Sequence, residues 1–229
     1  MSTKRKSPRK YFDVRHLGPE DLDAYYKSLT TSNDYLGEYL DWGIHAPQFN
    51  YEDCSDVFSR MLKAKKPDED FAICVWNQMV GQISFGPSST VDGLQITYWV
   101  GKNHAGKGLG TKAVSSLIEI AFLKRDIRYL EIHVDRANLA SAAIPKKLGF
   151  KLYDSYDCDD KGTKGSGIMD VYILLSPKEK FKETVAMLQN KPYVRLDVRP
   201  SAWGRKQSLK HLKLYQPANP NWFIGQGAS

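Results

Sequence analysis

A glycine-rich segment, Gly101-Lys-Asn-His-Ala-Gly-Lys-Gly-Leu-Gly110, is the part of the sequence best suited to binding a phosphate group. A strand is expected before this segment and a helix after it. Such a loop presents free backbone N–H groups at the positive end of a helix dipole, and both features attract phosphate oxygens. The segment therefore predicts a phosphate-binding site at the start of the helix.

Two nucleotide-binding motifs fit this segment poorly. Counted from Gly101, it has the glycines and the lysine of a Walker A loop, but Gly108 stands where that loop needs a hydroxyl for Mg²⁺. Counted from Gly106, the dinucleotide fingerprint GxGxxG/A needs Gly or Ala at the sixth position, which is Thr111. These mismatches argue against an NTPase, a kinase and a dinucleotide-dependent enzyme.

Three further segments accompany the loop: Tyr98-Trp99-Val100 before it, Asp135-Arg-Ala-Asn138-Leu-Ala-Ser141 after the next expected strand, and Lys147-Leu-Gly-Phe150 after the next expected helix. Gly108 and Gly110 match the pattern Q/R-x-x-G-x-G/A, with Ala105 in place of Gln or Arg. This arrangement resembles the GCN5-related N-acetyltransferases (GNAT), and among them the RimJ/RimL-like branch. The resemblance covers about residues 11–175 and is most specific from Tyr98 to Phe150.

The resemblance implies an acetyl-CoA-dependent N-acetyltransferase with an α/β (α+β) fold. Its central sheet would be mixed, mostly antiparallel, splayed in the middle and flanked by helices. The pantetheine arm would lie in the splay, with Val100 and Gly101 offering backbone hydrogen bonds. The pyrophosphate would be wrapped by residues 105–111. Lys102, His104 and Lys107 would either add positive charge near the phosphates or simply form a solvated basic loop. The implied cofactor-binding residues are Trp99, Val100, Gly101, Ala105, Gly106, Lys107, Gly108, Leu109, Gly110, Thr111, Asn138 and Ser141.

The resemblance also implies roles for two residues of the short helix after the second strand of the splay. Ser141 would protonate or hydrogen-bond the leaving thiolate, and Asn138 would orient the pantetheine from the same side of the helix. An ordinary helix N-cap at Asn138, with Ser141 as a polar helix residue, is the structural alternative.

The general base is left open by the sequence. RimL-like proteins often carry a glutamate shortly after Leu-Gly-Phe, and Tyr153 stands at that position here. We take Asp154 as the third catalytic candidate, with Asp170, Glu131 and His133 as alternatives. Each of these groups could instead be structural.

An amine must be neutral to attack a thioester. An α-amine with a pKa near ~8 is roughly one tenth neutral at pH 7, whereas a lysine amine near ~10.4 is neutral less than ~0.1% of the time. The resemblance to the RimJ/RimL-like branch implies direct transfer, without a metal, to a protein or peptide N-terminal α-amine, and this difference in neutral fraction favours the same acceptor. The alternatives are acetylation of a small amine, such as an aminoglycoside or polyamine, and a non-catalytic CoA- or RNA-binding module. The acceptor-site candidates are Tyr35, Tyr39, Trp42, Glu131 and His133, and for the first three core packing is an equal alternative.

Alternating strand and helix patterns that could position these residues run through residues 11–190, which we expect to form one domain. Expected strands are 11–16, 71–76, 80–85, 94–100, 129–135, 150–155 and 168–175. Expected helices are 19–29, 34–40, 51–65, about 109–122, 138–148 and 176–189. Gly149 would end the 138–148 helix as its C-cap glycine.

The net charge of +7 is concentrated at the two ends of the chain. Residues 1–10 hold five basic and no acidic residues, residues 191–229 hold seven basic residues and Asp197, and residues 11–190 therefore carry −4. We expect a flexible arm over 1–10 and an extension over 191–229 whose aromatics either pack on the body, which we favour, or bind RNA. The two basic ends of the chain are compatible with a position near RNA or the ribosome.

The three cysteines, without CxxC spacing, fit neither a disulfide framework nor a zinc site and favour a reducing, cytoplasmic setting. No apolar run approaches the ~18 residues of a spanning helix, so we expect no membrane partner. Both a monomer and a homodimer are compatible with the sequence.

Overall fold

A seven-stranded sheet is the centre of the computed structural model, with the strand order β1-β2-β3-β4-β5-β7-β6. The structure describes residues 11–40, 50–63, 70–88, 90, 92–159, 161–177, 193–194 and 214–215. The strands are β1 (Phe12–His16), β2 (Asp70–Val75), β3 (Gln78–Pro87), β4 (Gly93–Val100), β5 (Tyr129–Asp135), β6 (Lys151–Asp157) and β7 (Ile168–Leu175). Only the β4–β5 pair is parallel within this sheet, which confirms a mixed, mostly antiparallel α/β fold.

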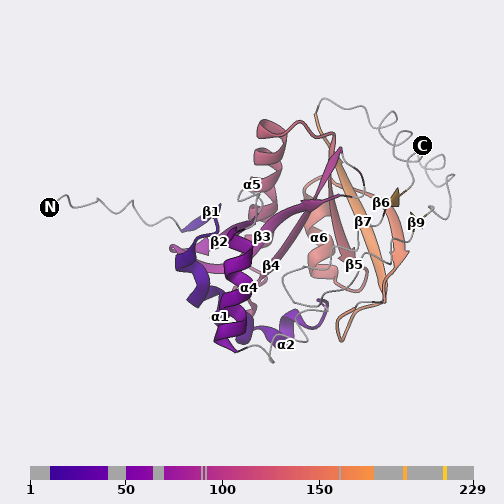
Figure 1. Ribbon diagram of the computed structural model, residues 1–229. Helices are drawn as coiled ribbons and strands as arrows, with labels where there is room; N and C mark the ends of the chain where they lie inside the picture. The colour runs from indigo at the N-terminus through magenta and orange to yellow at the C-terminus, as the bar shows by residue number, and fades with distance from the viewer. Residues whose placement is uncertain are drawn as a thin grey trace, which may run out of the picture.

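Helices cover both faces of the sheet (Figure 1). On one face, η1 (Pro19–Asp21), α1 (Leu22–Thr30), α2 (Asn33–Leu36) and α4 (Tyr51–Lys63) surround one buried apolar cluster. On the other face, η4 (Lys102–His104) leads into α5 (Leu109–Lys124), and α5 packs with α6 (Leu139–Lys147) over the main core. The two faces arise because successive strand residues point to opposite sides. Thus Ile96 and Tyr98 join the α5 cluster, whereas Trp99 joins the α1–α4 cluster.

The parallel strands β4 and β5 separate partway along their length. They pair at Gly93 with Tyr129, at Leu94 with Leu130 and at Gln95 with Glu131, and the pairing ends there. Both strands continue for several residues, to Val100 and Asp135. The predicted splay is therefore confirmed, and the backbone beyond Gln95 on this side has no ladder partner on β5.

Most expected elements are present within one to three residues of their predicted bounds. The exceptions have local causes. The β2–β3 turn is centred on Trp76 and Asn77 rather than on Asn77 and Gln78, because both central residues take positive φ (50° and 65°) and Gln78 already pairs with Val75. The helix expected over 34–40 spans only Asn33–Leu36. The arm over 1–10 and residues 178–189 of the helix expected over 176–189 lie outside the described residues, and the described Ser176 and Pro177 are not helical.

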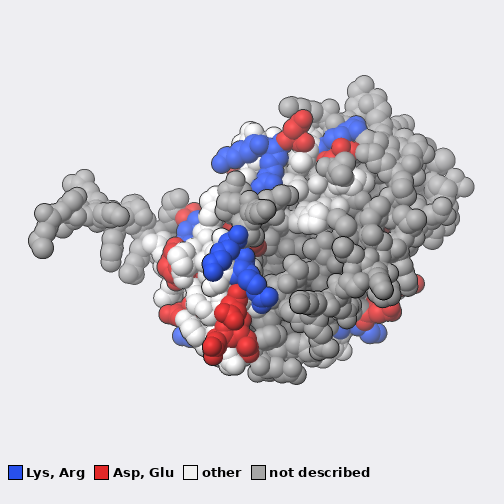
Figure 2. Space-filling model, in the orientation of Figure 1, with Lys and Arg blue, Asp and Glu red and all other residues white. Residues whose placement is uncertain are grey.

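In the C-terminal extension, the described residues form a two-stranded antiparallel pair, β8 (Tyr193–Val194) and β9 (Leu214–Tyr215). No helix among the described residues is both long and apolar enough to span a bilayer. Over α1, α4 and α5, basic and acidic side chains occur in small mixed groups (Figure 2). The described part of this face therefore has no large patch of purely basic or purely acidic side chains.

Candidate active site

Two glycines of the loop adopt a left-handed backbone conformation that favours glycine. Gly106 and Gly108 have φ of +73° and +74°, and a Cβ atom added to either would meet nothing within 4 Å. The first i→i−4 bond of α5 runs from the N–H of Lys112 to the carbonyl of Gly108 at 3.1 Å. The N–H groups of the first turn of α5, from Leu109 to Thr111, therefore precede the helical ladder and face the loop.

The backbone of β4 at the splay bears on two expected cofactor contacts, those of Val100 and Gly101, and corrects the second. The N–H of Gly101 donates to the carbonyl of Val80 on β3 at 2.8 Å, so this N–H is already engaged and is not available to a pantetheine amide. Because consecutive residues of a strand direct their backbone groups to opposite sides, Val100 directs its N–H and C=O toward β5. The Val100 contact therefore stays a prediction, whereas the Gly101 N–H bonds β3 instead of a cofactor.

Trp99 is also corrected. Its indole is 8% exposed on the α1–α4 face, lies 5.8 Å from the ring of Tyr25, and donates from Nε1 to Gln82 Oε1 at 3.3 Å. Strand alternation places this side chain on the face opposite α5, so Trp99 is a core residue.

Several contacts hold the loop in place. The N–H of Lys102 donates to the buried Ser32 Oγ at 3.0 Å, and Lys107 Nζ donates to the Asn103 carbonyl at 2.8 Å. Partial burial and the nearby Lys107 lower the pKa of His104. Ala105 has an extended backbone, and Thr111 is half-buried.

Gly110 is a glycine that allows α5 to pack closely against α6. A Cβ atom there would lie 3.0 Å from Ile144 Cδ1 and 3.9 Å from the Tyr98 ring, so a side chain would point into the contact between α5 and α6. The backbone N–H of Gly110 remains part of the first turn of α5.

Asn138 and Ser141 lie together at the start of α6. Asn138 Oδ1 accepts the N–H of Ser141 at 3.0 Å, which confirms the N-cap interpretation of Asn138. Ser141 Oγ lies 3.0 Å from the hydroxyl of Tyr98, which belongs to the splayed part of β4. Burial raises the pKa of Tyr98 to about 12, so its hydroxyl keeps its proton at neutral pH. A serine hydroxyl next to a protonated tyrosine can donate a proton, and this contact of Tyr98 was not predicted from the sequence.

The opposite face of β5 gathers the candidate bases. Glu131 and His133 are two residues apart on this face, and their Oε1 and Nε2 atoms are 3.2 Å apart. The other ring nitrogen of the histidine, Nδ1, lies 3.0 Å from the hydroxyl of Tyr156 on β6. Tyr156 was not predicted, although its place two residues after Asp154 on the same strand indicates a shared face.

A bulge in β6 places Tyr153 beside these groups. The register against β7 shifts between Leu152 and Asp154, which makes Tyr153 the extra residue, and its ring packs with the cluster that contains Tyr129. Asp154 lies opposite Val171 on β7, and Val171 lies opposite His133, so all three share a face. Burial raises the pKa of Asp154, and its Oδ1 accepts the N–H of Ser155 at 2.8 Å.

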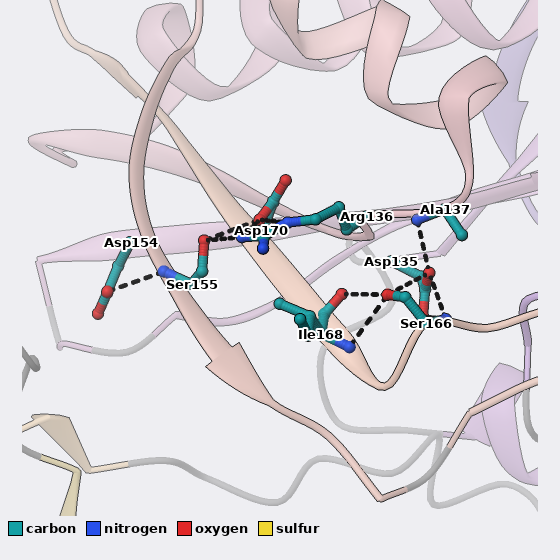
Figure 3. Close-up of polar contacts among 8 residues, drawn as sticks. All are labelled: Asp135, Arg136, Ala137, Asp154, Ser155, Ser166, Ile168 and Asp170. Atoms are coloured by element: carbon teal, nitrogen blue, oxygen red, sulfur yellow. Dashed lines mark hydrogen bonds and ion pairs between the residues drawn. The ribbon is translucent and has the colours of Figure 1, made fainter.

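Charged residues fix the end of β5 (Figure 3). Arg136 donates to Asp170 Oδ1 from Nη2 at 2.7 Å and to Ser155 Oγ at 2.9 Å, which ties β5 to β7 and β6. Asp170 Oδ1, one of the alternative bases, is therefore occupied by an ion pair with Arg136 and by the Ser155 hydroxyl, 2.7 Å away. Figure 3 shows the Asp154 carboxylate directed away from this cluster.

The β6–β7 loop links β5 to the segment expected to cover the acceptor. Buried Asp135 accepts the N–H and hydroxyl of Ser166, with Ser166 Oγ to Oδ1 at 3.0 Å. The same loop donates from the N–H of Thr163 to the Gly37 carbonyl at 2.9 Å and from the N–H of Lys164 to the Glu38 carbonyl at 2.8 Å.

This loop therefore holds the turn after α2 in place. Two predicted acceptor-site residues, Tyr35 and Tyr39, lie on or beside α2, both half-buried. Burial is also the main cause of the raised pKa of Tyr35. The third, Trp42, lies outside the described residues.

Gly162→Ala should loosen this loop. A Cβ at Gly162 would lie 2.4 Å from the backbone carbon of Glu38, which is closer than real contacts allow. We expect unfolding in denaturant to show a loss of about 1–3 kcal/mol, the usual effect of overpacking, together with faster amide exchange at Thr163 and Lys164. Gly86→Ala is the matched control, because a Cβ there meets nothing within 4 Å. Equal stability of the two variants would contradict the close approach.

Comparisons with known proteins agree with this geometry. The profile of a family described as "Acetyltransferase (GNAT) domain" matches residues 12–151. YdaF of Bacillus subtilis (strain 168), provisionally named a ribosomal N-acetyltransferase, is 24% identical over 142 residues, which are 61% of this chain and 78% of YdaF.

Two solved structures share the fold. RimL, the ribosomal L7/L12 alpha-N-protein acetyltransferase in complex with coenzyme A, has a TM-score of 0.65 at 18% identity, over 73% of this chain and 96% of RimL. The ribosomal-protein-S5-alanine acetyltransferase of Vibrio fischeri has a TM-score of 0.63 at 14% identity, over 76% of this chain and 98% of that one.

Proposed function

Because this chain belongs to the GNAT acetyltransferase family, we propose that it transfers the acetyl group of acetyl-CoA to the N-terminal α-amine of a protein or peptide. The observation that carries the proposal is the loss of β4–β5 pairing after Gln95, on strands that run to the glycine loop and to the start of α6. One end of the sheet thus has unpaired strand backbone, a phosphate-binding loop and the Asn138–Ser141 cap.

The described residues fit coenzyme A. The unpaired backbone groups of Val100 face β5 and would bond the pantetheine amides in the manner of an added strand. The diphosphate would lie over Gly106 and Gly108, where there is open space, and would accept hydrogen bonds from the first N–H groups of α5. Having Ala105 in place of Gln or Arg would weaken diphosphate binding little in this arrangement, because backbone N–H groups supply the hydrogen-bond donors. Lys107 adds a positive charge at the same loop.

The bound acetyl-CoA supplies an activated acyl group on sulfur. Ser141 would donate its proton to the departing thiolate, and the Tyr98 hydroxyl, 3.0 Å away, would restore it. The proton that the attacking nitrogen loses on becoming an amide would replace the one that Tyr98 gives up. Asn138 caps α6 through the Ser141 N–H and so holds the Ser141 backbone in position. Its amide NH₂ remains on the same turn to orient the pantetheine.

An α-amine acceptor suits this site for two reasons. The amine is about one tenth neutral at pH 7 before any help from the protein, so one weak base is sufficient. The names of YdaF, RimL and the Vibrio fischeri enzyme all refer to ribosomal-protein or ribosomal N-acetylation, which supports a protein acceptor.

The test is thiol release from acetyl-CoA with matched acceptors. We expect turnover of peptides with a free N-terminus, and at least 100-fold less with the same peptides blocked at the N-terminus and carrying a lysine, which follows from the neutral fractions of the two amines. Polyamines and aminoglycosides form the second arm. Faster turnover of these small amines than of every peptide would overturn the protein acceptor, and no turnover of any amine would overturn the enzyme.

A further inference from the structure

We propose that Asp135 is a positioning residue for the acceptor. It holds the β6–β7 loop, and through this loop it holds the turn after α2 at the open end of the splay. The inference rests on the proposed function, because Tyr35 and Tyr39, on and just after α2, are the predicted acceptor-site residues. Asp135 acts through backbone groups of the loop and does not itself contact the acceptor.

The side chain of Asp135 lies at the end of β5 on the face that carries α2. Asp135 is the last residue of this strand, and alternation places it opposite Val134, which belongs to the α5 cluster. Its Oδ1 accepts the N–H of Ala137 at 2.9 Å and the hydroxyl of Ser166 at 3.0 Å (Figure 3). Its Oδ2 accepts the N–H of Ser166 at 2.9 Å. One buried carboxyl group therefore connects β5, the turn before α6 and the β6–β7 loop.

The loop backbone passes directly against this carboxyl group. The pairing of β6 with β7 ends at Asp157 and Ile168, so residues 162–166 lie beyond the strand ladder. A Cβ atom on Gly165 would lie 3.1 Å from Asp135 Oδ2, which is closer than ordinary van der Waals contact. The carboxyl group thus fixes the path of the loop where strand pairing no longer does.

The other end of the same loop is bonded to the turn after α2. The N–H groups of Thr163 and Lys164 donate to the carbonyls of Gly37 and Glu38 at 2.9 and 2.8 Å. An ion pair between Lys164 Nζ and Glu38 Oε1, at 2.7 Å, joins the same two segments. Because Lys164 is exposed, this ion pair contributes little. The two backbone bonds therefore provide most of the link.

Together these contacts form a bridge between the ends of the two strands that separate. The bridge consists of Ser32, residues 33–38, residues 162–166 and Asp135. At the β4 end, the Ser32 hydroxyl accepts the N–H of Lys102, two residues after the strand, at 3.0 Å. At the β5 end, the bridge closes on Asp135. It therefore spans the open end of the splay on the face of α2.

The bridge is the route by which a change at Asp135 would reach the acceptor. Tyr35 and Tyr39 flank the segment that is bonded to the loop, and both are half-buried. Once Asp135 no longer holds the loop, the carbonyls of Gly37 and Glu38 lose a fixed partner, and the two tyrosines lose their fixed distance from the splay. A misplacement of about 1 Å at a site remote from the chemistry is enough to weaken catalysis strongly.

The first test measures amide hydrogen exchange in the protein alone. Asp135→Ala should accelerate exchange at Thr163 and Lys164 about 10-fold, because the bonds that protect these N–H groups depend on the position of the loop. Wild-type exchange rates at both amides in this variant would overturn the link between Asp135 and the turn after α2.

Asp21→Ala is the matched control for the loss of a buried carboxyl group. Asp21 and Asp135 are 3% and 5% exposed. Asp21 also accepts three donors, two from Arg15 and one from Gly18, but it lies at the start of α1 and has no part in the bridge. We expect this variant to lose stability as well, with wild-type exchange at the two loop amides.

The second test is steady-state transfer to a peptide with a free N-terminus. Asp135→Ala should raise the KM for the peptide about 10-fold, with an unchanged Kd for coenzyme A. The start of α6 keeps a bond that needs no side chain, from the N–H of Asn138 to the Asp135 carbonyl at 2.9 Å. Asp135→Asn is the conservative variant. All three donors lie within 3.0 Å of Oδ1, which an amide oxygen can replace, so the KM should rise less.

These outcomes separate the positioning role from a general loss of stability and from the proposed function. A lower kcat with an unchanged KM for the peptide, or an equal rise of this KM in Asp21→Ala, would overturn the positioning role alone. No turnover by the wild type would overturn the proposed function and with it the role toward the acceptor, while the exchange rates would still decide whether Asp135 holds the loop.

Discussion

Gly108→Val should lower the affinity for coenzyme A by at least 100-fold, which corresponds to about 2.7 kcal/mol of binding free energy. Gly108 has φ of +74°, a backbone conformation that a β-branched residue adopts only with strain. Its missing Cβ also points into open space, which is where the proposed function places the diphosphate. Isothermal titration calorimetry with coenzyme A measures the change directly.

Gly149→Val separates the loss of a ligand contact from backbone strain. Gly149 has φ of +85° and equally open surroundings, but it lies at the C-terminal end of α6, away from the loop. We expect both variants to lose similar stability and only Gly108→Val to lose affinity. Equal affinities of the two variants would show that the loop does not hold the diphosphate.

Ser141→Ala should lower kcat by about 100-fold, the usual contribution of one positioned proton donor, without changing the affinity for coenzyme A. The reason is the 3.0 Å contact between Ser141 Oγ and the Tyr98 hydroxyl, which remains protonated because burial raises the pKa of Tyr98 to about 12. The N-cap bond is retained in the variant, since Asn138 accepts a backbone N–H. Steady-state thiol release at saturating acetyl-CoA measures the effect.

Two further variants test the same step and provide its control. Tyr98→Phe keeps the packing of the ring but removes the hydroxyl, so kcat should fall in the same step and by a smaller factor. Ser116→Ala is the matched control, because Ser116 Oγ donates only to the Lys112 carbonyl within α5. Unchanged kcat in both Ser141→Ala and Tyr98→Phe would mean that water or another group protonates the thiolate.

The corrections at Trp99 and Gly101 share a cause. Their neighbours in the motif, Tyr98 and Val100, face the splay, whereas the alternation of a strand turns Trp99 and the Gly101 N–H toward β3 and the α1–α4 face. A sequence motif consists of consecutive residues, whereas the side chains and backbone groups of consecutive strand residues point in opposite directions. The pairing of β4 with β3 therefore decides which residues of the motif face the splay.

Local patterns predicted most strands and helices, whereas the splay between β4 and β5 was implied by the resemblance to the GNAT family. The periodicity of apolar residues predicted the strands and helices, because burying one face is the main source of their stability. The glycine-rich segment predicted a loop between β4 and α5 with free backbone N–H groups. The Asn138–Ser141 spacing predicted the N-cap, because that bond spans three residues of one helix turn.

The grouping of the candidate bases and the hydroxyl partner of Ser141 depend on contacts between distant parts of the chain. Tyr98 meets Ser141 across 43 residues, and His133 meets Tyr156 across 23. The register between β5, β7 and β6 decides the second contact, and the bulge at Tyr153 shifts that register by one residue. Such pairings are set by how the whole sheet packs, since a shift of one residue turns every side chain of a strand to the other face.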